Sequence, residues 1–344
     1  MPGNRGEKWH YRLMALISEE AFMNILASTP HILLGNGFSI ALSKKVTYGQ
    51  LMPRMLENPV VGPSLTEMSA SDIEMALYVL EVAGKITKIA SVHETIKHLH
   101  EGIRDEFINL LAKIEPARKS EVCPDQLSHC CSVLKAFDLK FTLNFDPFLY
   151  WAVLQEPDEW MNDGFRNDYG RGRKAWDYEV RVKTWWLHGA LHQFVDHSGG
   201  FDLVYKVTAN MDSTLMDQVS KELSQGGSPN AVLGGTWKQK RSHIQRSAYL
   251  DTALRNLESI EENIIVYGWS AAEQDDHIIK ALKGKDVYFA VHKPSSSTGI
   301  EAEAKATSRG WLTFDSSWLD FWGPKCGTCM PCRTESGSFK IFRG

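Results

Sequence analysis

Apolar positions along the chain follow two spacings, one typical of helices and the other of buried strands. Apolar residues three and four positions apart predict a helix over residues 8–28, which Thr29-Pro30 ends. A second helix is expected over residues 271–282, between two strand-like segments, and this strand–helix–strand order predicts a parallel sheet. The short apolar runs that predict strands occupy residues 31–34, 139–145, 184–187, 263–267 and 287–291.

A long helical stretch interrupts this order. Residues 64–115 carry apolar positions at helical spacing, and we expect a mainly helical insertion over about 45–138 that serves as a lid or an oligomer surface. Residues 226–230 and 293–300 are rich in Gly, Pro and Ser and are predicted to be loops. The expected fold class is α/β, a Rossmann-like parallel sheet with helices on both faces. One domain is expected over 1–322, followed by a Cys-containing tail over 323–344.

Composition narrows the classes of partner. The net charge of −4 and the pI of about 6.3 give no reason to expect nucleic acid or an acidic membrane as the main ligand. No apolar run approaches the ~20 residues that cross a bilayer, and the first residues do not resemble a signal peptide. We therefore expect a cytoplasmic protein without a membrane partner. Six cysteines in 344 residues are too few for a disulfide framework, so reduced thiols are expected.

The segment Gly35-Asn36-Gly37-Phe38-Ser39 follows the first predicted strand. A glycine turn that opens a helix presents backbone N–H groups to an anion, which suits a pyrophosphate. The dinucleotide fingerprint is incomplete because Ile40 stands where a third glycine is expected. A plain tight turn explains the segment equally well.

Polar groups also follow the strand predicted over residues 139–145. Pro147 ends this strand, and residues two apart share one side of it, so Asn144 and Asp146 are expected to project together. A neutral amide beside a carboxylate can bind a ribose hydroxyl and a carboxamide. The alternative is an Asx-turn that caps the next helix.

His188-Gly189 follows the strand predicted over residues 184–187. A histidine here can move a proton near neutral pH, and the adjacent glycine would let a substrate approach. A single histidine more often has a structural role, and His192 is a rival for the chemical one.

Three further segments admit two interpretations each. Gly268-Trp269-Ser270 can face an adenosine ribose or phosphate, or Ser270 can cap the next helix. The basic residues 238–246 can contact nucleic acid or a phosphate, but a solvated helix face is the more common role. Asp275-Asp276-His277 suits the first turn of a helix, where acids are favourable, better than a metal site.

The order of four motifs in this chain resembles sirtuin-like NAD-consuming domains. The resemblance covers about residues 32–291 and is greatest to the bacterial branch associated with anti-phage defence, rather than to the protein deacylases. It implies NAD as substrate, with no metal required, and a homo-oligomer or a regulatory partner protein that restrains the enzyme. The motifs are Gly35-Asn36-Gly37-Phe38-Ser39, Thr142-Leu143-Asn144-Phe145-Asp146, Leu187-His188-Gly189 and Tyr267-Gly268-Trp269-Ser270.

The resemblance also implies roles for individual residues. Asn144 would be the catalytic asparagine that positions the nicotinamide ribose, with Asp146 supporting that side of the pocket. His188 would be the general base or the partner of a ribose hydroxyl. Residues 35–39, chiefly Gly35, Gly37 and Ser39, would hold the NAD phosphates, and Gly268 and Ser270 would line the adenosine end.

The chain departs from the deacylases in its cysteines. Deacylating sirtuins carry a zinc module between these motifs, whereas residues 147–262 contain no cysteine. Hydrolysis of NAD to nicotinamide and ADP-ribose is therefore favoured over deacylation. A non-catalytic NAD or ADP-ribose sensor and an ADP-ribosyl transferase are the alternatives. Cys326, Cys329 and Cys332 offer three zinc ligands where four are usual, and Cys123, Cys130, Cys131 or a histidine could supply the fourth. A reduced, redox-sensitive tail is the favoured interpretation.

Overall fold

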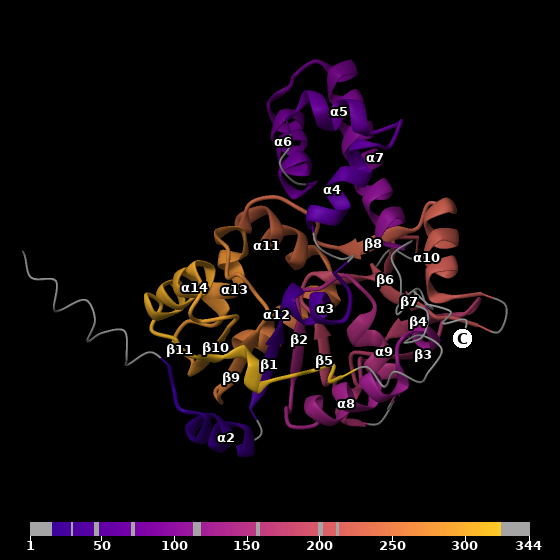
Figure 1. Ribbon diagram of the computed structural model, residues 1–344. Helices are drawn as coiled ribbons and strands as arrows, with labels where there is room; N and C mark the ends of the chain where they lie inside the picture. The colour runs from indigo at the N-terminus through magenta and orange to yellow at the C-terminus, as the bar shows by residue number, and fades with distance from the viewer. Residues whose placement is uncertain are drawn as a thin grey trace, which may run out of the picture.

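The centre of the molecule is a six-stranded parallel sheet (Figure 1). The structure is a computed structural model that describes residues 16–28, 30–44, 48–69, 73–112, 118–155, 159–198, 202–210 and 213–324. The strand order is β11-β10-β9-β1-β2-β5, which confirms the predicted parallel sheet and adds one strand, β11. The strands are β1 (His31–Leu34), β2 (Lys140–Thr142), β5 (Thr184–Trp186), β9 (Ile264–Tyr267), β10 (Val287–Val291) and β11 (Leu312–Asp315).

Strand β1 lies at the middle of this sheet and is buried along its whole length, as an apolar central strand should be. From β1 the chain order runs outward through β2 and β5 on one side, and through β9, β10 and β11 on the other. The direction of the order reverses between β1 and β9. Such a switch point opens a crevice beyond the carboxyl ends of the strands.

Helices flank the sheet, which confirms the α/β class (Figure 1). Several begin later than their apolar patterns suggest. Ile17 donates its backbone N–H to Thr313, and the Ser18 hydroxyl caps the first described helix, so residues 16–18 are not helical. The flanking helices are α2 (Glu19–Ala27), α3 (Asn36–Leu42), α8 (Pro124–Leu134), α9 (Phe148–Gln155), α11 (Trp237–Arg246), α12 (Ala248–Glu258), α13 (Asp276–Ala281) and α14 (Ser297–Thr307).

Two of the predicted boundaries near the C-terminus are wrong. The helix expected from residue 271 begins as a short 3₁₀ turn, η5 (Glu273–Asp275), and becomes α-helical only at α13. The loop expected over 293–300 ends at Ser296, whose hydroxyl accepts the backbone N–H of Gly299 and so caps α14. At α14 a capping group, not the hydrophobic period, sets where the helix starts.

A second, antiparallel sheet was not expected from the sequence. Its order is β3-β4-β7-β6-β8, and strand β8 occupies part of the region predicted to be a loop. Pro229 made that segment resemble a loop, yet a proline is tolerated here because β8 is an edge strand. The strands are β3 (Phe165–Asp168), β4 (Arg173–Trp176), β6 (Gly189–Asp196), β7 (Leu203–Val207) and β8 (Ser228–Ala231).

The expected helical insertion consists of four helices between α3 and α8, followed by the short 3₁₀ turn η3 (Lys119–Glu121). They rise above the sheet in Figure 1, and α7 reaches down to β6 and to α10 (Leu215–Ser224). Among the described helices, even the longest, α7, lacks the apolar length needed to cross a membrane. The four helices are α4 (Tyr48–Leu56), α5 (Gly62–Glu67), α6 (Ile73–Ile86) and α7 (Ala90–Ala112).

A buried ion pair, Lys206 with Asp163, lies between β7 and the start of β3. Each side chain is 7% exposed, and the Lys206 ammonium also lies 4.7 Å from the centre of the Tyr150 ring. Burial by itself would lower the pKa of Lys206, but the Asp163 carboxylate raises it. Lys206 therefore keeps its charge, and the two side chains form a buried pair in which each compensates the other.

We expect Lys206→Met to lower the free energy of unfolding by about 3–5 kcal/mol, because it leaves the Asp163 carboxylate buried without its cation. Urea denaturation followed by circular dichroism measures this. Lys174→Met is the matched control, since Lys174 lies opposite Lys206 on β4 but its side chain is 39% exposed, and a change under about 0.5 kcal/mol is expected. Equal losses in the two variants would contradict the role of the buried pair.

Candidate functional site

A cavity of about 660 Å³ opens at the carboxyl ends of the parallel strands. Every one of the six strands contributes a residue that lies just beyond its end. This is the switch-point crevice between β1 and β9, where α/β sheets bind ligands. The six residues are Gly35 after β1, Asn144 after β2, His188 after β5, Gly268 after β9, His292 after β10 and Ser316 after β11.

The floor of the cavity is a contact between two glycine turns. The Gly35 N–H donates to the Tyr267 carbonyl at 2.8 Å, and the Gly37 N–H donates to the Gly268 carbonyl at 2.7 Å. A Cβ on Gly37 would lie 2.6 Å from the Gly268 Cα, and Gly268 itself has φ +70°. Glycines are therefore needed for the two backbones to touch. The N–H groups of Gly35 and Gly37 already donate to these two carbonyls, so they are not free donors for a phosphate. The sequence had predicted that they would be.

The rest of the predicted phosphate segment divides between cavity and core. Asn36 lines the cavity, whereas the Phe38 side chain is fully buried against Phe321 and Trp322. The Phe38 carbonyl accepts the Trp322 indole N–H at 2.8 Å. Phe38 therefore anchors α3 in the core and does not line the cavity.

Asn144 is held by the nitrogen end of its side-chain amide group. Its Nδ2 donates to the Gly35 carbonyl at 3.0 Å and to Ser39 Oγ at 2.8 Å. Ser39 is thus a partner of Asn144 and not a lining residue. With both amide hydrogens used, Oδ1 remains as the acceptor that Asn144 can offer to a ligand. The amide orientation follows from this hydrogen-bond network.

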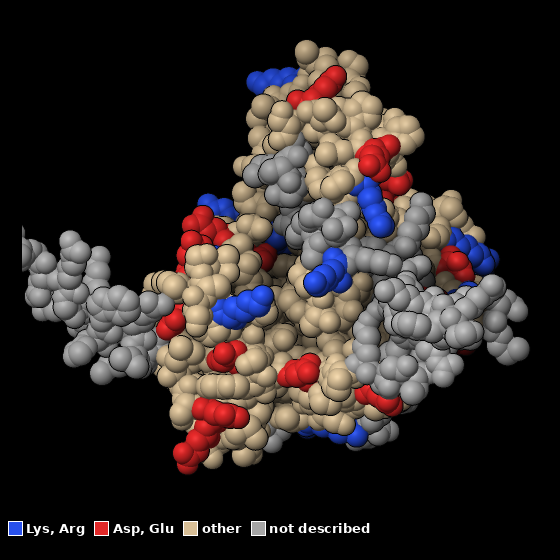
Figure 2. Space-filling view, viewed as in Figure 1, with Lys and Arg blue, Asp and Glu red and all other residues tan. Residues whose placement is uncertain are grey.

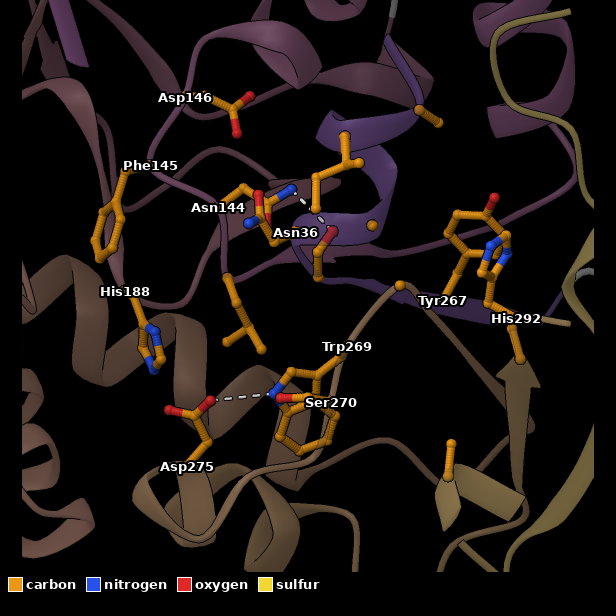
Figure 3. Close-up of a pocket in the computed structure, with 18 of the residues that line it drawn as sticks. Asn36, Asn144, Phe145, Asp146, His188, Tyr267, Trp269, Ser270, Asp275 and His292 are labelled. Atoms are coloured by element: carbon orange, nitrogen blue, oxygen red, sulfur yellow. Dashed lines mark hydrogen bonds between the residues drawn. The ribbon is translucent and has the colours of Figure 1, made fainter. Parts of the chain in front are cut away.

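Asp146 lines the cavity on the same side as Asn144, as the period-two argument predicted (Figure 3). Its Oδ1 also accepts the Phe148 N–H at 3.0 Å, so the alternative Asx-turn at the start of α9 is present too. Burial raises the pKa of Asp146 to about 6, although the Ser39 hydroxyl and backbone N–H groups favour the ionised form.

His188 lies across the cavity from Tyr267 and His292 (Figure 3). The adjacent Gly189 has φ +78°, and a Cβ there would lie 1.7 Å from the Asn230 carbonyl oxygen of β8. Gly189 therefore allows two strands to pack; the expectation that it makes room for a substrate is wrong. His192, the rival, does not line the cavity, because it is buried between the rings of Tyr150 and Trp186.

A cluster that sequence reasoning assigned to a helix start surrounds His188. Nε2 of His188 lies 3.0 Å from Nε2 of His277. Asp275 accepts a hydrogen bond from the Lys240 ammonium at 3.0 Å. It accepts another from the Trp269 indole N–H at 3.1 Å, which is drawn in Figure 3. Lys240 belongs to the basic run 238–246, so that run is only partly a solvated face. The titratable side chains of Asp275-Asp276-His277 were evident in the sequence, but only the fold brings His277 beside His188.

The ionisation of this cluster follows from burial and charge. Burial lowers the pKa of His188 well below its ordinary value and that of His277 to about 4, so both are neutral at neutral pH. Burial opposes ionisation of Asp275, but the Lys240 ammonium and the hydrogen bond from the Trp269 indole N–H lower its pKa to about 2. The cluster therefore combines one buried ion pair with two neutral imidazoles.

Residue types that bind metal ions are grouped at two places in the chain. Cys326, Cys329 and Cys332 lie outside the described residues, whereas Cys123, Cys130 and Cys131 are buried and form no disulfide among the described residues. Within the described chain, His188, Asp275 and His277 bring three ligand-type atoms within 4.8 Å of one another. These residue types suit a transition metal, but both Asp275 oxygens already accept hydrogen bonds from protein groups.

The remaining walls come from distant parts of the chain. Leu51 of α4 and two residues of α7, Phe107 and Leu111, close one side of the cavity. Ser270 lines it as expected, but α13 begins six residues later, so Ser270 does not cap that helix. On the face shown in Figure 2, acidic and basic side chains of the described residues are interspersed and form no basic stripe.

We expect Asp146→Asn to change how stability depends on pH. The folded-state pKa of about 6 lies above the ordinary 3.8, so the stabilisation is complete below pH 3.8 and is lost as pH rises through 6. Wild-type protein should therefore lose about 2–3 kcal/mol relative to the variant between pH 4 and pH 7. Urea denaturation of both proteins across this range measures it, and a constant difference would contradict it.

The chain is similar to several solved structures and matches one protein family. Three solved structures share low identity with the chain: a Sir2 homologue in complex with NAD (14% identity, TM-score 0.37, covering 86% of this chain and 95% of that chain), a mutant Sir2 homologue in complex with ADP ribose (14%, 0.35, 86% and 97%) and a mutant Sir2 homologue in complex with 2′-O-acetyl ADP ribose (15%, 0.37, 94% and 100%). No curated protein matches the sequence. The family described as a domain of unknown function, DUF4917, matches residues 32–293, from β1 to just beyond β10. Because this match spans most of the chain and all four motifs, the chain belongs to the DUF4917 family.

Proposed function

We propose that the protein is an NAD glycohydrolase. It cleaves the bond between nicotinamide and ribose: water adds its oxygen to the anomeric carbon, nicotinamide leaves with the bonding electrons, and one proton is released. The products are nicotinamide and ADP-ribose. The ring nitrogen of nicotinamide is cationic in NAD, so the leaving group is good and the transition state resembles an oxocarbenium ion, as in glycoside hydrolysis.

The free oxygen of Asn144 carries this proposal. Its amide hydrogens are used by Gly35 and Ser39, so its Oδ1 is a fixed acceptor at the wall of the cavity. A fixed acceptor can orient the attacking water or a hydroxyl of the nicotinamide ribose without reorganising during the reaction. This is the role that the motif order, similar to that of sirtuin-like domains, implies for Asn144.

The surroundings of Asn144 suit a cationic transition state. Leu143, Phe145 and Trp269 line the same cavity and limit access of bulk water. Asp146, ionised above about pH 6, and His188 are the titratable groups near Asn144 that line it. They can hold the ribose hydroxyls or take the proton that the attacking water loses. The proposal leaves Ser270 and His292 at the end of the cavity that would receive the adenosine.

Two alternatives use the same cavity. A sensor would bind NAD or ADP-ribose without cleaving it, and a transferase would pass ADP-ribose to a protein or nucleic acid in place of water. The role as a regulated, NAD-depleting effector of anti-phage defence, with a homo-oligomer or a partner protein as restraint, is also part of the proposal and rests on the motif order alone.

We expect purified protein to release nicotinamide from NAD, and Asn144→Asp to reduce kcat at least about 100-fold, the usual effect of losing a group that positions the nucleophile. The change keeps the shape of the side chain but replaces the amide hydrogens that bind Gly35 and Ser39. Release is followed by chromatography of nicotinamide and ADP-ribose.

Asn167→Ala is the control, since Asn167 is exposed on β3, and wild-type turnover is expected. Circular dichroism and calorimetric titration with NAD show whether Asn144→Asp still folds and binds. Tight NAD binding without nicotinamide release in the intact protein, with and without added candidate partners, would replace the enzyme with the sensor. Nicotinamide release without free ADP-ribose would indicate the transferase.

A further inference from the structure

We propose that His277 is a positioning residue that donates its Nε2–H to His188 Nε2 and thereby fixes the tautomer of His188. In that tautomer His188 carries its proton on Nδ1 and acts as a hydrogen-bond donor toward the cavity. The inference deepens the proposed function and rests on it for the identity of the ligand, a ribose hydroxyl oxygen of NAD. The arrangement of the protons is a property of the protein alone.

The geometry leaves one shared proton between the two rings. The two Nε2 atoms lie 3.0 Å apart, a hydrogen-bond distance at which one imidazole must donate and the other accept. Both side chains are buried, at 4% and 0% exposure, and burial lowers the pKa of each. Two neutral rings allow two arrangements, which differ in which ring donates.

The second nitrogen of His277 decides between these arrangements. Its Nδ1 is completely enclosed and has no hydrogen-bond partner among the described residues. If His188 donated, His277 would carry its proton on this Nδ1, as an enclosed N–H without an acceptor, which is rare in folded proteins. If His277 donates from Nε2, its Nδ1 carries only a lone pair. An enclosed lone pair without a donor costs less free energy than an enclosed N–H without an acceptor.

The same choice suits His188. Its Nδ1 is not among the enclosed polar atoms without a partner, and His188 lines the cavity. A proton on this atom can therefore reach a ligand or water. Asp275 accepts from Lys240 and Trp269, and no hydrogen bond joins it to His188 in the described part of the chain. Arg241 and Asp276 are the other charged groups whose fields reach His277.

A metal ion on the same atoms is disfavoured by the same observations. Coordination through Nε2 would place the proton of His277 on Nδ1, and metal-bound histidines almost always donate that N–H to an acceptor. The described residues provide none. In addition, the Lys240 ammonium lies 3.0 Å from the Asp275 carboxylate, where it would repel a divalent cation.

This assignment divides the chemistry between two side chains. His188 donates to a ribose hydroxyl oxygen and so orients the ribose, and it does not accept the proton of the attacking water. That proton falls to Asp146, the other titratable group beside Asn144 in the cavity. The nicotinamide–ribose bond breaks and the water–ribose bond forms as in the proposed reaction, with the released proton passing through the Asp146 carboxylate.

Nitrogen-15 NMR of histidine-labelled, full-length protein tests the tautomer without any NAD. Spectra of His188→Gln and His277→Gln assign the two rings by the signals that disappear. We expect a protonated Nδ1 and an unprotonated Nε2 in His188, with the reverse in His277, and no change on adding EDTA. A protonated Nε2 in His188, or signals that move on adding EDTA, would overturn the proposal.

Two substitutions at His277 then test the effect on catalysis. His277→Gln retains an N–H donor near the position of Nε2, and its kcat should stay within about threefold of wild type. His277→Glu offers only an acceptor, so it should move the His188 proton to Nε2 and reduce kcat about tenfold or more, the effect of losing one hydrogen bond.

An unchanged or higher kcat in His277→Glu, with the tautomer reversed in the NMR spectrum, would show that His188 acts by accepting a proton. If the wild-type protein does not cleave NAD, the NMR result still decides the tautomer. Failure of the proposed function and failure of this inference are thereby separate outcomes.

Discussion

The site depends on one backbone contact, between the turn after β1 and the turn after β9. Gly37 and Gly268 bring their main chains together so closely that neither position has space for a Cβ. The contact joins the two strands between which the strand order reverses. It also fixes the Gly35 carbonyl, and this carbonyl holds the Asn144 amide. Two turns and one catalytic candidate are therefore positioned by a single close approach.

Buried polar groups surround that contact on the side of β5 and α13. The side chains of His188, His277, Asp275 and Lys240 are all buried, and each forms a hydrogen bond or an ion pair with another member of the group. Replacing such a network with apolar residues is often neutral or stabilising in other proteins. Its placement at the end of a strand, beside the cavity, is better explained by chemistry than by stability.

The sequence predicted the parallel sheet well, because β1, β5, β9 and β10 are apolar runs bounded by turn residues. It also brought Asn144, Asp146 and His188 to one place, since parallel strands end at the same edge of a sheet. The antiparallel sheet was not predicted, because β3, β4 and β8 are short and rich in polar residues and the pairings of β4 with β7 and of β6 with β8 are non-local. The predicted roles of Phe38 and Gly189 were wrong for a related reason. A glycine or an aromatic residue in or beside a motif suggests a functional role, but the sequence does not show what the residue packs against. His277 was missed because no spacing along the chain indicates a contact 89 residues away.

Two contributions to the walls of the cavity come from separate parts of the chain. The strand ends supply polar groups such as Asn144 and His188, whereas α4 and α7 supply Leu51, Phe107 and Leu111 from a segment inserted after α3. Reactivity and ligand size are thus encoded in separate stretches of the gene. Variation within residues 48–112 can reshape the entrance for a larger or smaller ligand while every polar group at the strand ends stays in place. In such an arrangement the size of the ligand that enters can change while the polar groups at the strand ends are retained.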